Sequence, residues 1–247
     1  MSKLTLYEFP HSHYCEVARW ALEYKGLAYK AHCLLPGFHA VQMKRLAGAS
    51  SLPVLRDDDR IIQGSGAIVD HLDQYYPQRP LTPTTDVATV HEFEAEVSRD
   101  IGVPLRRLCY YHLMPRPELV RYFFMHRSSP VAGWVFRFMY PLLSRRLRDT
   151  YDCTADGAAT ACAALTSAIA RFDQRLADRE YFFDDKFSRA DLTFAALLVF
   201  MVMPAEYPVN WPPELTDHEL GRWFANFGTT ASYQHVSRIY ANYRLPA

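Results

Sequence analysis

The feature that most constrains this chain is an apolar run that directly follows a helix-start signal. Ser188 and Asp191 fit the capping box, in which each side chain bonds the other residue's backbone N–H. The run after them, LTFAALLVFMVM, contains no charge. A helix that is apolar on every side belongs in the centre of a helical bundle. We therefore expect a helical core built around residues 188–203.

The first 80 residues carry a different pattern, in which strand and helix signals alternate. β-prone residues indicate strands at about 4–9 and 29–34 and a hairpin over VLRDDDRIIQ, residues 54–63. Helical spacing and stop signals indicate helices over about 14–25, 39–46 and 65–76. The predicted order of elements is therefore βαβαββα.

Strand signals end at about residue 86, after the linker QRPLTPTTD (residues 78–86). Helices are expected over about 86–111 and 117–149, through the stripe Leu165, Ile169, Phe172 and Leu176, and from about 216 onward. We predict fold class α+β, with an α/β domain over residues 1–79 and an all-helical domain over residues 86–247.

Composition argues against several functions. The 27 basic residues balance 27 acidic ones, so no basic surface for nucleic acid is expected. The five cysteines have irregular spacing, which predicts reduced thiols rather than a metal site. The apolar stretches 131–143 and 192–205 are shorter than the about 20 residues of a spanning helix, so no membrane contact is expected. The N-terminus, MSKLTLYEFP, lacks a secretion signal, so we expect a cytoplasmic protein.

The stretch HSHYCEVAR, residues 11–19, contains half of a C-x-x-C redox motif. Ser12 stands where the leading cysteine would be, and Cys15 is the second cysteine. The start of a helix favours an anion, because its unpaired N–H groups and its dipole point there. A thiolate brought by another molecule would accept a charge-assisted hydrogen bond from Ser12. Serine is also a preferred N-cap, and this purely structural role stays open.

Four stretches together resemble the soluble glutathione S-transferase family, with a bacterial-like, serine-type active site. They are SHYCEVARWALEYKGL, SLPVL, QGSGAIVDHLDQYYP and FSRADLTFAALL. They are similar to the family's first-helix motif, its cis-proline loop, the start of its third helix and the capping box of its central helix. The resemblance implies a thioredoxin-like domain that binds glutathione, an all-helical second domain and a homodimer.

The resemblance also implies roles for particular residues. Ser12 would stabilise the thiolate of glutathione. Leu52 and Pro53, joined by a cis bond, would pair with its cysteinyl unit, although an ordinary trans proline stays an alternative. Ser65 would cap the third helix and hold the γ-glutamyl carboxylate. Lys44 is the candidate cation for the glycyl carboxylate, and a solvated surface role is its alternative.

One position departs from the family's pattern. The family usually has an acidic or amide residue just before Ser65, which contacts the ammonium group of glutathione. This chain has Gly64 there. Gln63 and Asp70 are the candidates to replace that contact, and whether Gly64 weakens glutathione binding stays open.

Other side chains near Ser12 have competing interpretations. Tyr7 is a rival hydroxyl, but its place in a strand favours packing. Cys15 is expected to be a packed helix residue, because free cysteines are commonly buried. His11 and His13 would favour a thiolate if charged, although exposed histidines on a loop are more often bystanders.

The expected activity is conjugation or substitution by glutathione at an apolar electrophile, by an enzyme without a metal or other cofactor. The aromatic residues considered for the electrophile pocket, with no catalytic role, are Tyr110, Tyr111, Phe123, Phe124 and Trp211. One alternative is a glutathione-dependent isomerase or dehalogenase of the same family. Another is a non-catalytic binding or scaffold protein, which Gly64 favours. The sequence does not identify the electrophile.

Overall fold

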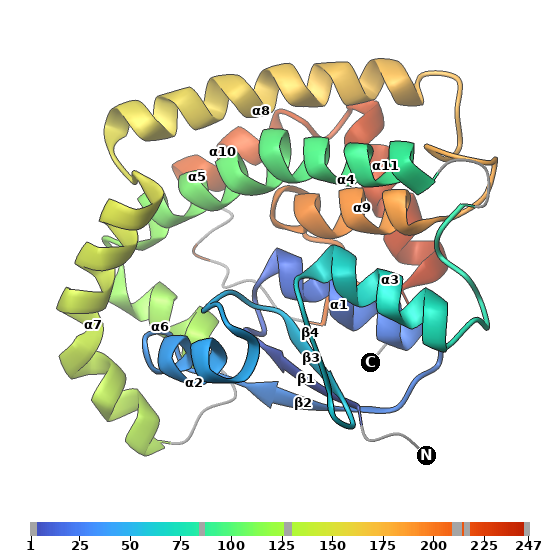
Figure 1. Ribbon diagram of the computed structural model, residues 1–247. Helices are drawn as coiled ribbons and strands as arrows, with labels where there is room; N and C mark the ends of the chain where they lie inside the picture. The colour runs from blue at the N-terminus through green and yellow to red at the C-terminus, as the bar shows by residue number, and fades with distance from the viewer. Residues whose placement is uncertain (1–3, 84–86, 126–129, 209–213, 215–217, 245–247) are drawn as a thin grey trace.

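The computed structural model describes residues 4–83, 87–125, 130–208, 214 and 218–244, with the backbone alone at residues 124, 125 and 130–135. The N-terminal part contains a four-stranded sheet and helices (Figure 1). Its elements are β1 (Leu4–Glu8), α1 (His13–Tyr24), β2 (Tyr29–Cys33), α2 (Phe38–Ala47), β3 (Val54–Asp57), β4 (Arg60–Gln63) and α3 (Ser65–Tyr75). The predicted order βαβαββα is confirmed, and this part has the expected thioredoxin-like fold.

The sheet is mixed, with strand order β2-β1-β3-β4. β1 runs parallel to β2 and antiparallel to β3, so α1 serves as the crossover that a parallel pair requires. β3 and β4 form the predicted hairpin, in which Asp57 pairs with Arg60 and Asp58 takes a left-handed conformation with φ of 51°. A short polar residue tolerates that conformation, which is why aspartates occupy this turn.

The two faces of the sheet bury different side chains, because successive residues of a strand point to opposite sides. Leu4 and Leu6 of β1 belong to the large core shared with α1 and α3. Tyr7 and Phe9 pack instead against the smaller cluster around Met43 of α2. Figure 1 shows α1 and α3 lying between the sheet and the helical part of the chain.

The rest of the described chain is helical. Its elements are α4 (Val87–Val97), the π-helical turn η1 (Ser98–Gly102), α5 (Val103–Leu113), α6 (Pro117–Met125), α7 (Pro130–Tyr151), α8 (Ala155–Leu176), α9 (Arg189–Val202), α10 (Glu219–Ala225) and α11 (Ala231–Tyr243). The predicted stripe Leu165, Ile169, Phe172 and Leu176 is buried on α8. None of the described helices is long and apolar enough to cross a membrane.

A π-helical turn interrupts the helix that was predicted over residues 86–111. It lies between α4 and α5, where the hydroxyls of Tyr14 and Ser98 are hydrogen-bonded at 2.9 Å. At Gly102 an added Cβ would lie 2.6 Å from the Tyr14 hydroxyl, so glycine permits this close approach of α1 to the turn. The prediction missed the turn because it arises from this tertiary contact, not from the spacing of apolar residues.

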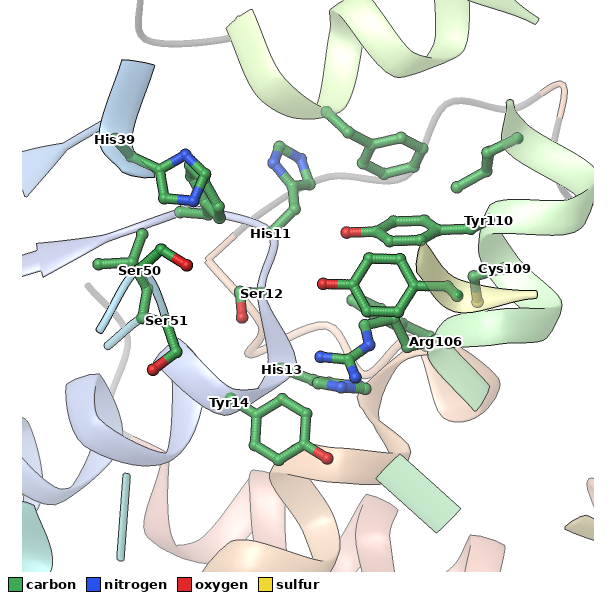
Figure 2. Close-up of a pocket in the computed structure, with 16 residues that line it drawn as sticks. His11, Ser12, His13, Tyr14, His39, Ser50, Ser51, Arg106, Cys109 and Tyr110 are labelled. Carbon is green, nitrogen blue, oxygen red and sulfur yellow. The ribbon is translucent and has the colours of Figure 1, made fainter. Parts of the chain in front are cut away.

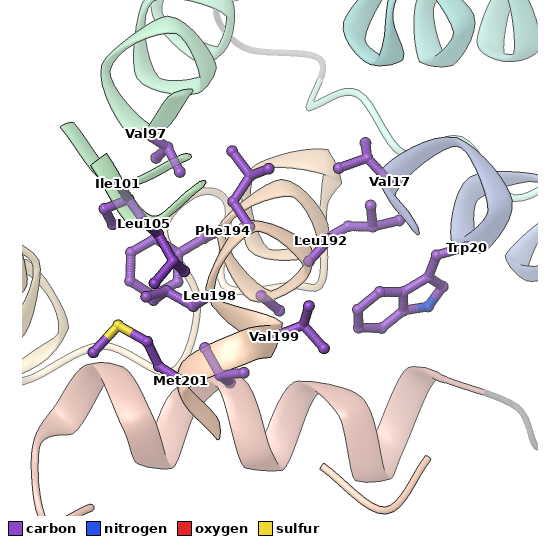
Figure 3. Close-up of a cluster of buried hydrophobic side chains, with 14 of the residues drawn as sticks. Val17, Trp20, Val97, Ile101, Leu105, Leu192, Phe194, Leu198, Val199 and Met201 are labelled. Atoms are coloured by element: carbon purple, nitrogen blue, oxygen red, sulfur yellow. The ribbon is translucent and has the colours of Figure 1, made fainter. Parts of the chain in front are cut away.

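Helix α9 lies at the centre of the helical part, as its sequence predicts. The capping box of Ser188 and Asp191 is present, with the Ser188 N–H donating to Asp191 Oδ2 at 3.0 Å. Every residue of α9 except Phe200 is buried. Figure 3 shows its side chains between Val17 and Trp20 of α1 on one side and Val97, Ile101 and Leu105 on the other.

Two buried arginines join the helical part to the N-terminal part. Arg189 pairs with Glu94 at 2.8 Å and with Asp70 of α3. Arg244, just after α11, pairs with Glu16 at 2.8 Å and with Glu23, both on α1. The large core also draws on both parts. The division into domains at 1–79 and 86–247 stays a prediction.

Candidate functional site

A cavity of about 260 Å³ opens beside the start of α1, between the N-terminal part and the helical part. The loops before α1 and β3 and the first turns of α1 and α2 form one side, and α5, α6 and α9 supply much of the other (Figure 2). The lining residues are Phe9, His11, Ser12, His13, Tyr14, His39, Ser50, Ser51, Leu52, Arg106, Cys109, Tyr110, Leu113, Phe123, Tyr151 and Phe200. Pockets that bind small molecules are commonly apolar with a few placed polar groups, and this cavity fits that description.

Ser12 is the N-cap of α1 and also lines the cavity. Its Oγ accepts a hydrogen bond from the Cys15 N–H at 3.3 Å, which confirms the capping role. The cap uses an oxygen lone pair, so the hydroxyl hydrogen is left over for another acceptor. Capping therefore does not compete with donation to an anion in the cavity. The first-turn N–H groups of α1, which have no partner within the helix, point to the same place.

The histidines on either side of Ser12 are buried, which corrects the expectation of exposed loop residues. His11 packs edge-on against Phe123 at a ring distance of 4.7 Å, and His13 stacks on Phe200 at 5.2 Å. Burial, reinforced by the positive charge of Arg106, lowers the pKa of His13 to about 3. His13 is therefore neutral near pH 7 and supplies no positive charge to a thiolate. Burial also lowers the pKa of His39 of α2, another residue of the cavity wall.

Cys15 and Tyr7 take no visible part in the cavity. The Cys15 side chain is fully buried, and burial together with the charge of Glu8 raises the pKa of its thiol to about 12. Such a thiol is a packing residue and a poor nucleophile. Tyr7 lies outside the cavity lining, with its ring 5.1 Å from that of His32.

The loop before β3 brings Leu52 to the cavity wall, and the predicted cis bond between Leu52 and Pro53 is confirmed. Gln63 stabilises this loop from β4, because its Nε2 donates to the carbonyl oxygens of Ala49 at 2.9 Å and Ser51 at 2.8 Å. The amide of Gln63 is thus engaged by the protein. Both bonds use the NH2 group, and a role of Gln63 in ligand binding stays a prediction.

The start of α3 differs from the expectation. Gly64 is the N-cap, and Ser65 is the first helical residue without a side-chain capping bond. Gly64 has φ of 98°, a conformation that side chains rarely adopt, so backbone geometry accounts for the glycine. Asp70 is paired with Arg189 and with His91, at 3.0 Å, and its contact with the ammonium group of glutathione stays a prediction.

The other predicted glutathione contacts are not among the residues that line the cavity. Pro53, Ser65 and Lys44 do not line it, and Lys44 is exposed on α2. The ligand-binding roles of Leu52, Pro53, Ser65, Lys44 and Gln63 stay predictions.

Arg106 of α5 is a charged residue of the cavity that the sequence analysis missed. Its guanidinium lies over the ring of Tyr151, with the central carbon 4.4 Å from the ring centroid, and 5.6 Å from that of Tyr14. One signal could have found it. Tyr110 was expected in the pocket, and Arg106 stands four residues before it, on the same face of a helix.

The aromatic expectations are met in part. Tyr110 and Phe123 line the cavity, and Tyr111 does not. The side chain of Phe124 and the whole of Trp211 lie outside the described residues. Tyr151 and Phe200 line the cavity without having been predicted. Within the described part of the chain, no group of His, Cys, Asp and Glu side chains is arranged to hold a metal ion.

Comparison with known proteins identifies the N-terminal part. Residues 6–80 match the family model described as glutathione S-transferase, N-terminal domain. A stringent starvation protein A homolog of Pasteurella multocida is 32% identical over 87 residues, which are 35% of this chain and 41% of that protein. Glutathione S-transferase Z1 of Arabidopsis thaliana is 34% identical over 84 residues, 33% of this chain and 38% of that protein. These matches span about two fifths of the relatives' length.

Solved structures resemble the chain over nearly its whole length. A glutathione S-transferase of Ceriporiopsis subvermispora, solved in complex with glutathione, superposes with a TM-score of 0.65 and 18% identity over 98% of both chains. A beta-etherase from Sphingobium sp. strain SYK-6 gives 0.62 and 17%, covering 96% of this chain and 99% of the other. At such identity the likeness shows the fold alone.

Proposed function

We propose that the chain is a member of the soluble glutathione S-transferase family and an enzyme that transfers glutathione to an electrophile, because residues 6–80 match the family's N-terminal domain. The observation that carries the proposal is the position of Ser12. It stands at the N-terminus of α1 on the cavity wall, and its cap leaves the hydroxyl hydrogen available. A thiolate placed there receives that hydrogen bond together with the field of the helix.

The proposed reaction begins when the thiol of glutathione loses its proton to solvent in the cavity. The sulfur lone pair then attacks an electrophilic carbon of the second substrate. In a substitution, the new C–S bond forms as the bond to the leaving group breaks, and that group departs with its electron pair. Ser12 lowers the free energy of the thiolate before attack. The chain's own Cys15 cannot replace the external thiol, because it is buried and its pKa is raised to about 12.

The rest of glutathione is proposed to lie toward β3 and α3. The backbone of Leu52 would pair with the cysteinyl unit, and the N–H groups at the start of α3, near Ser65, would hold the γ-glutamyl carboxylate. Lys44 is left as the candidate for the glycyl carboxylate, with Gln63 holding the loop between them. Gly64 offers no side chain to the ammonium group, so we expect weak binding of glutathione.

A second candidate is a binding or scaffold protein with this fold, which does not catalyse the transfer. The absence of a side chain at Gly64 favours it, and the P. multocida relative bears the name of a stringent starvation protein, not of a transferase. An isomerase or dehalogenase would use the same thiolate. For either enzyme we propose a homodimer in the cytoplasm, a setting in which the five free cysteines stay reduced.

The test combines retention on immobilised glutathione with turnover of 1-chloro-2,4-dinitrobenzene. The transferase predicts retention, and a loss of activity in Ser12→Ala that Tyr7→Phe and Cys15→Ser do not share. If the protein is not retained on the column and does not turn over the substrate, the binding or scaffold protein becomes the better account. Activity that survives in Ser12→Ala but is lost in Tyr7→Phe would move the site to the tyrosine.

A further inference from the structure

The cavity holds a positive charge that no described carboxylate neutralises. Arg106 lines it, and its Nε is shielded from solvent without a hydrogen-bond partner. Across the described chain, Arg106 forms no ion pair and donates no hydrogen bond. Arg106 is half-buried, whereas the arginines that are buried more deeply are paired: Arg19 with Glu16, Arg189 with Glu94 and Arg244 with Glu16. A partly shielded charge without an acidic partner is costly, so its position beside a cavity points to an anion from outside the chain.

The guanidinium is held in a way that suits a carboxylate. It stacks over the face of Tyr151 at 4.4 Å, with Tyr14 at 5.6 Å. A cation–π contact of this kind uses none of the N–H groups of the guanidinium as hydrogen-bond donors, so they are available to a ligand. Those donors form a fork that matches the two oxygens of a carboxylate. The contact with Tyr151 already restricts the side chain of Arg106, so a ligand that binds it causes little further loss of side-chain entropy.

The other cavity walls suit a flat ring. Tyr110, Phe123, Tyr151 and Phe200 are aromatic, and no acidic residue is among the described residues that line the cavity. His13 adds no charge near neutral pH, since its pKa is lowered to about 3 by burial and by Arg106 itself. A volume of about 260 Å³ lies just below the range of about 300–1,000 Å³ of drug-sized sites, which favours a small substrate.

We propose that the electrophile is a small aromatic carboxylate, and that Arg106 binds its carboxyl group while Ser12 stabilises the attacking sulfur. Figure 2 shows the side chain of Arg106 reaching from α5 into the space that Ser12 faces from the opposite wall. A ring between them has its carboxylate at Arg106 and its reactive carbon toward the sulfur. The inference rests on the proposed transferase function. It replaces the apolar electrophile expected from the sequence with an anionic one.

The test compares 4-chloro-3,5-dinitrobenzoate with its methyl ester, since the two differ in charge and share the reacting carbon. In both, sulfur displaces chloride, which leaves with the electron pair of the C–Cl bond. We expect the wild type to favour the carboxylate in kcat/KM. Arg106→Met should lower kcat/KM for the carboxylate about ten- to a hundredfold more than for the ester, mainly through KM, as loss of a hydrogen bond to a charged group predicts. Arg106→Lys should recover part of the loss.

Arg121→Met is the matched control, because it removes the same charge from an exposed position on α6 outside the cavity lining. It should leave the ratio of the two substrates unchanged. Equal losses for carboxylate and ester in Arg106→Met would show that Arg106 acts on the thiolate and would overturn the inference. A wild type that does not prefer the carboxylate to the ester would overturn it as well.

A binding measurement separates this inference from the transferase proposal. Calorimetry without glutathione should show that 3,5-dinitrobenzoate binds more tightly than 1,3-dinitrobenzene, with the preference lost in Arg106→Met. If that preference is found while neither chlorinated substrate turns over, the transferase proposal fails and the anion site stands. If turnover occurs without the preference, the transferase stands and the anion site fails.

Discussion

Substitutions at Ser12 separate two contributions of its hydroxyl group. The oxygen caps α1 and stabilises the fold, and the hydrogen is proposed to stabilise the thiolate. The cap bond from the Cys15 N–H is 3.3 Å long, beyond the usual 2.7–3.2 Å, so its loss in Ser12→Ala belongs at the low end of the capping range, about 0.5–1 kcal/mol of unfolding free energy. The proposed bond to the thiolate is charge-assisted and contributes about 1.5–3 kcal/mol.

The sign of the second effect follows from which protonation state the bond favours. The hydroxyl donates to the thiolate, so its removal destabilises the charged form and raises the pKa of bound glutathione. At about 1.4 kcal/mol for each pKa unit, Ser12→Ala should raise this pKa by about one to two units. Ser12→Asp retains the cap and places a negative charge beside the sulfur, so it should raise the pKa at least as far without loss of stability. Ser12→Thr keeps the hydroxyl and should resemble the wild type.

The pKa is measured from the ultraviolet absorbance of the thiolate in the enzyme–glutathione complex across pH, and the stability from urea unfolding of each variant. A wild-type thiol pKa in Ser12→Asp would contradict the proposed stabilisation of the thiolate by the Ser12 hydroxyl. A Ser12→Ala variant that is less stable but leaves the pKa of bound glutathione unchanged would contradict it as well, since Ser12 would then only cap the helix.

Three further predictions concern stability, each measured by urea unfolding. The free energy of unfolding should fall as pH falls from 6.5 toward 3, because His13 takes up a proton in the unfolded chain but not in the folded protein, where its pKa is about 3. The dependence of the unfolding free energy on pH should be shallower in His13→Asn, and an unchanged dependence would contradict the prediction. Arg244→Met should cost about 3 kcal/mol, the low end of the range for breaking a buried pair, because Glu16 keeps Arg19 as a remaining partner. Adding Glu16→Gln should recover part of that loss unless the pair is uncoupled. Gly64→Ala should lower the free energy of unfolding by more than about 1 kcal/mol, because residue 64 has a φ of 98°. Gly66→Ala should lower it less, because a Cβ fits there without a clash. Equal losses in the two variants would rule out backbone strain at Gly64.

Local signals predicted the fold well where local physics decides it. The capping box at Ser188 and the uncharged run behind it placed α9 in the core, because a helix without a polar face has no stable position at a surface. The aspartates of the β3–β4 turn predicted the hairpin in the same way, since a left-handed residue is needed there.

Sequence reasoning failed where contacts between distant segments decide. The histidines next to Ser12 read as loop residues, but Phe123 and Phe200, more than a hundred positions away in the chain, bury them. The π-helical turn at Ser98 depends on Tyr14 in the same way. Arg106 was not among the predicted site residues, because its contact with the ring of Tyr151 joins residues far apart in the chain.

The contact between Arg244 and α1 has a consequence for biosynthesis. Two side chains of α1 have partners near the C-terminal end of the described chain. The indole of Trp20 donates to the Tyr243 carbonyl at 3.0 Å, and Glu16 pairs with Arg244 at 2.8 Å. A nascent chain therefore leaves the ribosome with this flank of its first helix uncovered, and it stays so until translation has passed codon 244. Throughout that interval the helix that carries Ser12 is a natural client for chaperones.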